Sequence, residues 1–150
     1  AIQLRATLSN LANYKGCYYI TAVDRSGNES PKSNVVCVDN CPNYLLPNAF
    51  SPNGDGLNDT FMAFDNPFSK CPRFVTNVEL FIVNRWGTEV FRYASQSATE
   101  NDPFIRWDGK DPSGNELPAG TYYFSVTVLF DVVDPTKKQK TLKGTIQLLR

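Results

Sequence analysis

The sequence predicts an all-β protein whose main part is an antiparallel, immunoglobulin-like β-sandwich of about seven short strands. Three observations support this prediction. Apolar residues recur at every second position in the best-patterned segments, and no segment has the periodicity of an amphipathic helix. Gly, Pro, Asn and Asp cluster between these segments, as tight turns require. A hydrophobic content of 41%, with 13% aromatic residues, is enough to form a packed core.

The strands with the clearest pattern are 76–83 and 121–133. Val78, Leu80 and Ile82 share one face of the first. In the second, every other residue from Tyr122 to Val132 is apolar, so this face should line the core. Shorter strands are predicted at 44–46, 60–64, 88–93, 105–107 and 142–148. We therefore place one domain at residues 41–150.

Residues 1–40 are too short for a sandwich of their own, yet they contain two strand-like segments. Residues 17–24 and 33–38 flank a turn-forming stretch at 25–31, which predicts a β-hairpin. An isolated hairpin is marginally stable in water. We expect residues 1–40 to be the end of a preceding β module, and the chain to be the C-terminal piece of a longer protein.

Charge and composition argue against several classes of function. Lys plus Arg and Asp plus Glu both total 15, so the net charge is zero. A neutral chain is a poor electrostatic partner for nucleic acid or an anionic membrane surface. The absence of histidine excludes His-based triads and His-containing zinc sites. No apolar run approaches the roughly 20 residues of a membrane-spanning helix.

The four cysteines, at positions 17, 37, 41 and 71, favour two disulfides and an oxidising compartment. Their spacing contains no Cys-x-x-Cys pair, which weakens a zinc-ribbon or thioredoxin interpretation. Four cysteines allow three connectivities. We favour Cys17–Cys37 and Cys41–Cys71, because each pair would tie segments that the predicted strands make neighbours. The alternative is four buried thiols.

The stretch from Leu46 to Phe61 is the most distinctive loop in the sequence. Gly54 and Gly56 allow backbone conformations with positive φ, and the Asn and Asp side chains can bond nearby amides. Part of the loop overlaps a calcium-binding pattern, with oxygen ligands from Asn53, Asp55, the Leu57 carbonyl and Asp59. A complete calcium loop needs an acidic first ligand and a Glu at its twelfth position, where this chain has Ser51 and Met62. We therefore favour a rigid self-bonded turn, with calcium as the alternative and no other cofactor.

The sequence offers candidates for two further kinds of site. The carboxylate pairs Asp55/Asp59 and Asp108/Asp111 could suit glycoside hydrolysis, but they occupy Gly- and Pro-rich turns where Asp commonly serves turn geometry. We expect no enzymatic activity. Trp86 and Trp107 could stack on sugars, although we expect both rings to pack over loop ends, as aromatic residues in small sandwiches usually do.

Several motifs identify a resemblance. Residues 46–61 (LPNAFSPNGDGLNDTF) resemble the opening of the gliding motility-associated C-terminal domain, the type B sorting domain of Bacteroidetes type IX secretion cargo. The resemblance continues through NRWG at 84–87, WDG at 107–109, LPAGTYY at 117–123 and KGTI at 143–146, and covers residues 42–150. Residues 18–24 (YYITAVD), followed by GNES at 27–30, look like the end of a fibronectin type III module, so the hairpin should be a partial fibronectin III-like unit.

The resemblance implies a function. Such domains direct a large cell-surface protein, for example an adhesin, through the type IX secretion system to the cell surface. Type B members stay associated with the outer membrane through a barrel protein of the secretion and attachment machinery. The expected partners are thus the type IX translocon and that barrel protein, bound without covalent chemistry. The rival function is a calcium-dependent carbohydrate-binding β-sandwich module.

The family motif places its functional residues on this chain position by position. Most should secure the fold, whereas the exposed turns, chiefly Asn53 to Asp59 and Arg85, should form the recognised surface. The motif positions are Asn48, Phe50, Pro52, Asn53, Gly54, Asp55, Gly56, Asn58, Asp59, Asn84, Arg85, Trp86, Gly87, Trp107, Asp108, Gly109, Pro118, Gly120, Thr121, Tyr122, Lys143 and Gly144.

Overall fold

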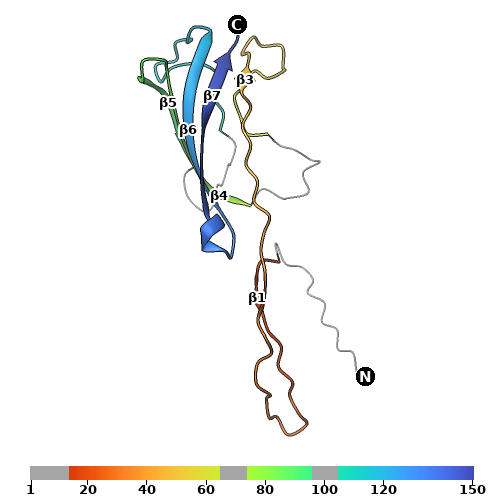
Figure 1. Ribbon diagram of the computed structural model, residues 1–150. Coiled ribbons are helices and arrows are strands. Elements are labelled where there is room, and N and C mark those ends of the chain that lie inside the picture. The colour runs from red at the N-terminus through yellow and green to blue at the C-terminus, as the bar shows by residue number, and fades with distance from the viewer. Residues whose placement is uncertain (1–13, 65–73, 96–104) are drawn as a thin grey trace.

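The computed structural model describes residues 14–64, 74–95 and 105–150, and these residues form an all-β, sandwich-like protein of immunoglobulin-like type (Figure 1). The only helical element in this part of the chain is one short 3-10 turn, η1 (Pro135–Lys137). The strands are β1 (Gly16–Tyr18), β2 (Val36–Val38), β3 (Ala49–Phe50), β4 (Val75–Val83), β5 (Glu89–Ala94), β6 (Gly120–Phe130) and β7 (Gln139–Leu148). Among the described residues, no helix has the length and hydrophobicity of a membrane span.

The main sheet has five strands in the order β3-β7-β6-β4-β5. Its centre is built by long antiparallel pairs, in which Ile82 lies opposite Phe124 and Phe124 opposite Gly144. The pair β3–β7 is parallel, with Phe50 opposite Leu148. The sheet therefore departs from the antiparallel pattern at this one edge, where the first strand of the domain meets its last.

Extended segments rather than regular strands cover the inner face of this sheet. Phe61 and Trp107 exchange backbone hydrogen bonds of 2.8 and 3.2 Å, and the Phe64 amide donates to the Leu45 carbonyl at 2.9 Å. The strands predicted at 44–46, 60–64 and 105–107 are thus in place as packed segments, but only single bridges form between them. Their buried side chains still make the second layer of the sandwich.

The core is an aromatic cluster centred on Trp107, whose side chain is fully buried. Its ring lies 5.2 Å from the ring of Phe50, 5.6 Å from Tyr122 and 5.9 Å from Phe91, measured between centroids. The indole Nε1 donates to the Lys110 carbonyl at 2.9 Å, so its one polar atom is satisfied. Valines and leucines from the inner faces of β4, β6 and β7 complete the core.

The β1–β2 hairpin extends away from the main sheet, toward the lower end in Figure 1. A disulfide joins Cys17 to Cys37, which lie directly opposite each other in the β1–β2 register. Apolar side chains on both sides of this ribbon are exposed, including Tyr19, Ile20, Val23, Val35, Val36 and Val38. That it belongs to a larger preceding module, with a boundary near residue 40, remains a prediction.

The linker after the hairpin is tied to the lower end of the sheet. The carboxylate of Asp39 accepts hydrogen bonds from the amides of Val133 and Asp134 at 2.7 and 3.0 Å, and the Asn40 side chain donates to the Asp131 carbonyl at 2.6 Å. Cys41 follows and is disulfide-bonded. Its expected partner, Cys71, lies outside the described residues.

Candidate docking surface

The loop at residues 51–59 is held by its own polar side chains. The Asp59 carboxylate accepts hydrogen bonds from the amides of Gly54 and Gly56 at 2.7 and 2.8 Å. Asp55 accepts from the Leu57 amide at 2.7 Å, while the Asn53 side chain donates to Asp55 at 2.9 Å. Gly54 and Gly56 both adopt left-handed conformations, with φ of 79° and 83°. The loop is therefore a turn with an exposed tip, and hydrogen bonds between its own residues define its shape.

These bonds also set the charge state of the loop. The amides of Gly54 and Gly56, in that order of effect, lower the pKa of the Asp59 carboxyl below its ordinary value. The anion is thus the form that the turn stabilises at neutral pH. Asp59 is only half-buried, so water shares in this stabilisation.

The four expected calcium ligands lie in this loop, but their side-chain oxygens serve the loop itself. Asn53, Asp55 and Asp59 accept from backbone amides of the same turn. Among residues 14–64, 74–95 and 105–150, no three carboxylates, cysteines or histidines are grouped as a metal site would require. The donor set fits a self-bonded turn better than a cage for a doubly charged ion.

Many motif residues secure the fold from buried positions. Phe50 and Trp107 belong to the aromatic core, and the Asn48 carbonyl accepts from the Gln147 amide at 2.8 Å. Gly109 has φ of 77°, and a Cβ atom there would lie 3.2 Å from Leu148 and 3.3 Å from Pro52. Glycine is therefore required at this position for both conformation and packing.

Arg150, two residues beyond the end of β7, reinforces the same region, and the sequence did not single it out. Its guanidinium donates to the carbonyls of Leu117 and Gly109 at 2.9 and 3.2 Å, and pairs with Glu116 at 3.0 Å. Beside it, Lys110 pairs with Asp108 at 3.3 Å. The charged side chains of Asp108, Lys110, Glu116 and Arg150 line a hollow of about 300 Å³. Residues of the 51–59 loop line the same hollow.

Trp86 corrects one expectation, because its side chain is 74% exposed rather than packed over a loop end. Trp86 lies at the tip of the β4–β5 turn. The Asn84 side chain holds this turn, because its oxygen accepts hydrogen bonds from the amides of Trp86 and Thr88, both at 3.0 Å. The Arg85 guanidinium lies 4.1 Å from the Trp86 ring centroid, a cation–π contact. Gly87, with φ of 82°, completes the turn.

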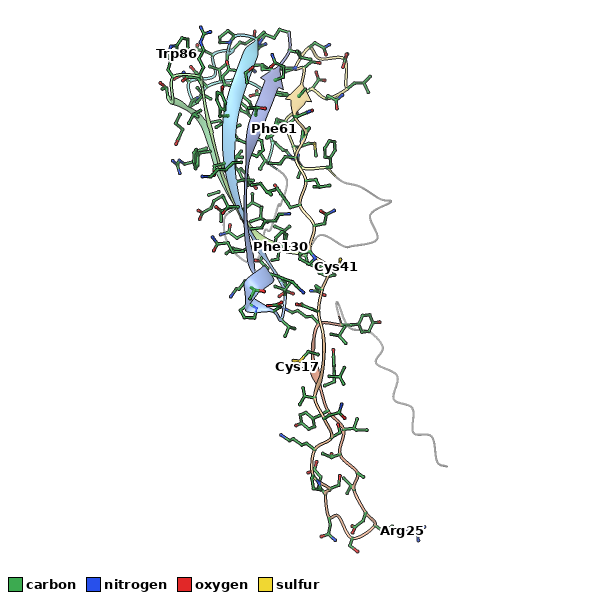
Figure 2. All side chains as sticks on the ribbon, in the orientation of Figure 1. Cys17, Arg25, Cys41, Phe61, Trp86 and Phe130 are labelled. Atoms are coloured by element: carbon green, nitrogen blue, oxygen red, sulfur yellow. A yellow bond between two sulfur atoms is a disulfide. The ribbon has the colours of Figure 1, made fainter. Side chains whose placement is uncertain are left out.

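Most of the exposed motif residues gather at one end of the domain. Figure 1 shows the 51–59 loop beside β3 and the β4–β5 turn at the upper end, opposite the β1–β2 hairpin. Figure 2 shows the Trp86 side chain at that end and Arg25 at the far end. The start of β6 also lies there, with Gly120 and Thr121 lining a hollow of about 170 Å³ beside Trp86. We call this region the loop end: residues 51–59, 84–88 and 118–121.

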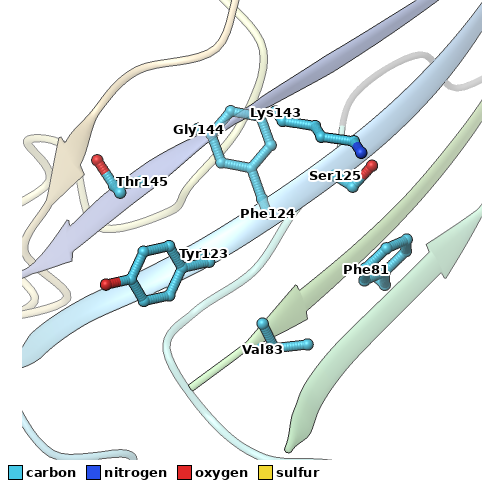
Figure 3. Close-up of a pocket in the computed structure, with 8 residues that line it drawn as sticks. All are labelled: Phe81, Val83, Tyr123, Phe124, Ser125, Lys143, Gly144 and Thr145. Carbon is cyan, nitrogen blue, oxygen red and sulfur yellow. The ribbon is translucent and has the colours of Figure 1, made fainter. Parts of the chain in front are cut away.

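Lys143 and Gly144 lie away from the loop end, in the middle of β7 (Figure 3). The Lys143 side chain is on the outer face of the sheet, where a groove of about 500 Å³ runs past Phe81, Val83 and Tyr123. Phe81 and Tyr123 are 40% and 46% exposed. Sequence reasoning missed this groove. The alternation in β4 does place Phe81 and Val83 on the face opposite the core, which was the available signal.

One comparison with known proteins identifies a family. Residues 44–148 match the model of the CHU_C type IX secretion signal domain. No curated protein matches. Among solved structures, the chain is similar to PorZ, described as an essential bacterial surface component of the type IX secretion system of Porphyromonas gingivalis, with 18% identity and a TM-score of 0.39. That similarity covers 71% of this chain but only 11% of PorZ. Because the family model spans most of the chain, this protein belongs to the family of type IX secretion signal domains.

Proposed function

We propose that this domain carries a large cell-surface protein, of which an adhesin is one example, through the type IX secretion system, and then holds it at the outer membrane by non-covalent docking. The family supplies the sorting role, and it is a family of secretion signals rather than of enzymes. The proposed partners are the translocon and an outer-membrane barrel protein of the attachment machinery. The proposed location is the outer face of the outer membrane.

The observation that best supports docking is the 51–59 loop. Its carboxylates are bonded to its own amides, so its shape is fixed before any partner arrives. A fixed loop loses little conformational entropy on binding, which favours recognition. The loop also lies at the end of the domain opposite the β1–β2 hairpin (Figure 1). A cargo attached on the hairpin side would therefore leave the loop end accessible.

Secretion of a reporter tests the proposal. A reporter fused to the full chain, expressed in a bacterium with a type IX system, should reach the cell surface. The same reporter with residues 42–150 deleted should stay in the periplasm. Protease accessibility on intact cells separates the two locations. Surface exposure of the deleted form would overturn the proposed function.

The outer-face groove favours a second candidate function, carbohydrate binding. The exposed rings of Phe81 and Tyr123 could stack on sugar faces, and the hydroxyl groups of Ser125 and Thr145 line the same groove (Figure 3). A glycan panel probed with the wild-type chain and with Tyr123→Ser tests this function. Binding that Tyr123→Ser abolishes would support it, and the absence of binding by the wild-type chain would remove it.

A further inference from the structure

Three turns of the chain share one geometry, and they differ in what they carry at the tip. In residues 24–28, 84–88 and 111–115, an Asx side chain accepts from the amides two and four residues later, at 2.8–3.0 Å. The first amide of each turn also donates to the fifth carbonyl. The fourth position is a glycine with φ of 82–86° in all three.

The third position of this turn is Ser26 in one case, Ser113 in another, and Trp86 in the β4–β5 turn. The turn therefore forms without an aromatic ring at its tip. Trp86 is also 74% exposed, so it contributes little to the core. An indole that neither the turn nor the core requires is suited to contact with a partner, and tryptophan is enriched among the residues that dominate protein interfaces.

Arg85 adds a charge to this ring. Its guanidinium stacks on Trp86 at 4.1 Å, and within the described residues it forms no ion pair with a carboxylate. Stacking uses the face of the guanidinium and leaves its in-plane N–H groups available to an acceptor. A carboxylate is the acceptor whose geometry and charge fit these donors best.

A hollow of about 170 Å³ adjoins the pair. It is lined by Asn84, Arg85 and Trp86 on one side and by residues 118–122 on the other. The Tyr122 hydroxyl donates to the Pro118 carbonyl at 2.8 Å, which fixes the second wall. Two stretches far apart in the sequence thus form one rigid recess beside an exposed ring.

We infer that Trp86 and Arg85 are the anchor of the docking surface, and that they insert into an apolar pocket with a carboxylate on an outer-membrane protein of the secretion machinery. This inference rests on the proposed function and assigns its contact residues. The positive charge of Arg85, which has no ion-pair partner among the residues that the structure describes, is the feature that selects an acidic partner. A lipid surface is the weaker occupant, because interfacial binding requires a broad apolar face together with excess positive charge. The chain has zero net charge and a single ring at this turn.

Surface delivery of the reporter fusion tests the anchor. Trp86→Ser should fold normally, because the same turn forms with Ser113 in the equivalent position, and its melting temperature should match that of the wild type. Its surface delivery should fall about tenfold or more, as for a dominant interface tryptophan. Surface delivery of Arg85→Glu should fall by a similar factor. Delivery of Arg85→Lys should fall less, because lysine keeps the positive charge but cannot form the bidentate hydrogen bonds of a guanidinium.

Matched controls come from the equivalent turn at the far end of the molecule. Arg25→Glu changes the same turn position and should leave delivery unchanged. The double variant Trp86→Ser with Ser26→Trp keeps the composition but moves the ring away from the loop end (Figure 2), so it should remain defective. Wild-type surface delivery of this double variant would show that an exposed tryptophan acts nonspecifically at any position, and would overturn the anchor.

The deletion of residues 42–150 separates the two levels of the proposal. If that deletion blocks delivery while Trp86→Ser and Arg85→Glu are delivered like the wild type, the anchor is wrong and the proposed function stands. If the deletion itself is delivered, the proposed function is wrong.

Fluorescence quenching gives a second readout that does not depend on delivery. The chain has two tryptophans, and Trp107 is buried, so acrylamide should quench mainly Trp86 in the isolated protein. Outer-membrane vesicles from the host should protect this signal, whereas vesicles of the extracted lipids without protein should not. Equal protection by both would assign the surface to lipid and overturn the protein partner, and no protection by either would overturn the anchor.

Discussion

Phe124 lies directly across the β6–β7 pair from Gly144, and a Cβ atom on Gly144 would lie 2.8 Å from the Phe124 ring. The ring continues into the core, where its centroid is 6.0 Å from that of Phe61. Gly144 therefore provides space for an aromatic residue in the centre of the sheet.

Gly144→Ala should destabilise the domain by about 1–3 kcal/mol, because the new methyl group must displace the Phe124 ring. Thermal denaturation measures the effect. Thr145→Ala, at the next and exposed position, should change the free energy of unfolding by less than about 0.5 kcal/mol. Adding Phe124→Leu to Gly144→Ala should recover part of the loss. Equal stability of Gly144→Ala and the wild type would contradict this role.

Acidification should open the 51–59 loop. The pKa of Asp59 is lowered by the amides of Gly54 and Gly56, so the stabilising bonds are fully present above the ordinary carboxyl value of 3.8. They are lost as the pH falls below 3.8 through the lower value of the folded protein. The amide NMR shifts of Gly54 and Gly56 should follow this transition, and Asp59→Asn should abolish it. A transition above pH 3.8 would show that the bonds do not hold the anion.

Calcium should leave the melting temperature unchanged. The carboxylates of Asp55 and Asp59 are already engaged with amides of their own loop, so a cation would have to displace those bonds. Scanning calorimetry with and without millimolar calcium measures this directly, because a ligand that binds only the folded state raises the melting temperature. A calcium-dependent rise that Asp59→Asn removes would instead support a calcium site in this loop.

Removal of the Cys17–Cys37 disulfide should melt the hairpin and spare the sandwich. The β1–β2 pairing is short and its apolar side chains are exposed, so the bridge supplies much of its stability, about 3 kcal/mol. The double variant Cys17→Ser, Cys37→Ser leaves Cys41 untouched. Hydrogen exchange should speed up across residues 16–38 and stay slow in β6 and β7. Retained protection of the hairpin would mean that other contacts hold it.

The central strands could be predicted because their pattern is local. Alternation in residues 76–83 and 121–133 corresponds to β4 and most of β6, and its apolar face is the core face. The chain leaves the sheet after Phe130, before the apolar pattern ends, and the Val133 amide donates to the carboxylate of Asp39 in the linker. That contact joins residues far apart in the sequence, so local pattern could not reveal it.

The edge of the sheet and the candidate surface were less predictable for the same reason. The segment predicted as a strand at 44–46 is a packed extended segment, because pairing with β7 starts only at Ala49 and depends on the position of Leu148. The exposure of Trp86 was also missed, because the sequence of a turn gives no information about which other segments pack against it. The outer-face groove required the β4–β6 register, which brings Val83 opposite Tyr123.

The strand order of the main sheet determines when the domain can complete its folding during synthesis. Because β7 lies between β3 and β6, the first strand of the domain has no neighbour until the last strand is in place. Ile146 and Leu148 of that strand are also fully buried, so a chain interrupted upstream of them would lack both a central partner and part of its interior. Under the proposed function, the secretion machinery could therefore recognise the folded domain only after synthesis through residue 148, and unfinished copies would not be exported.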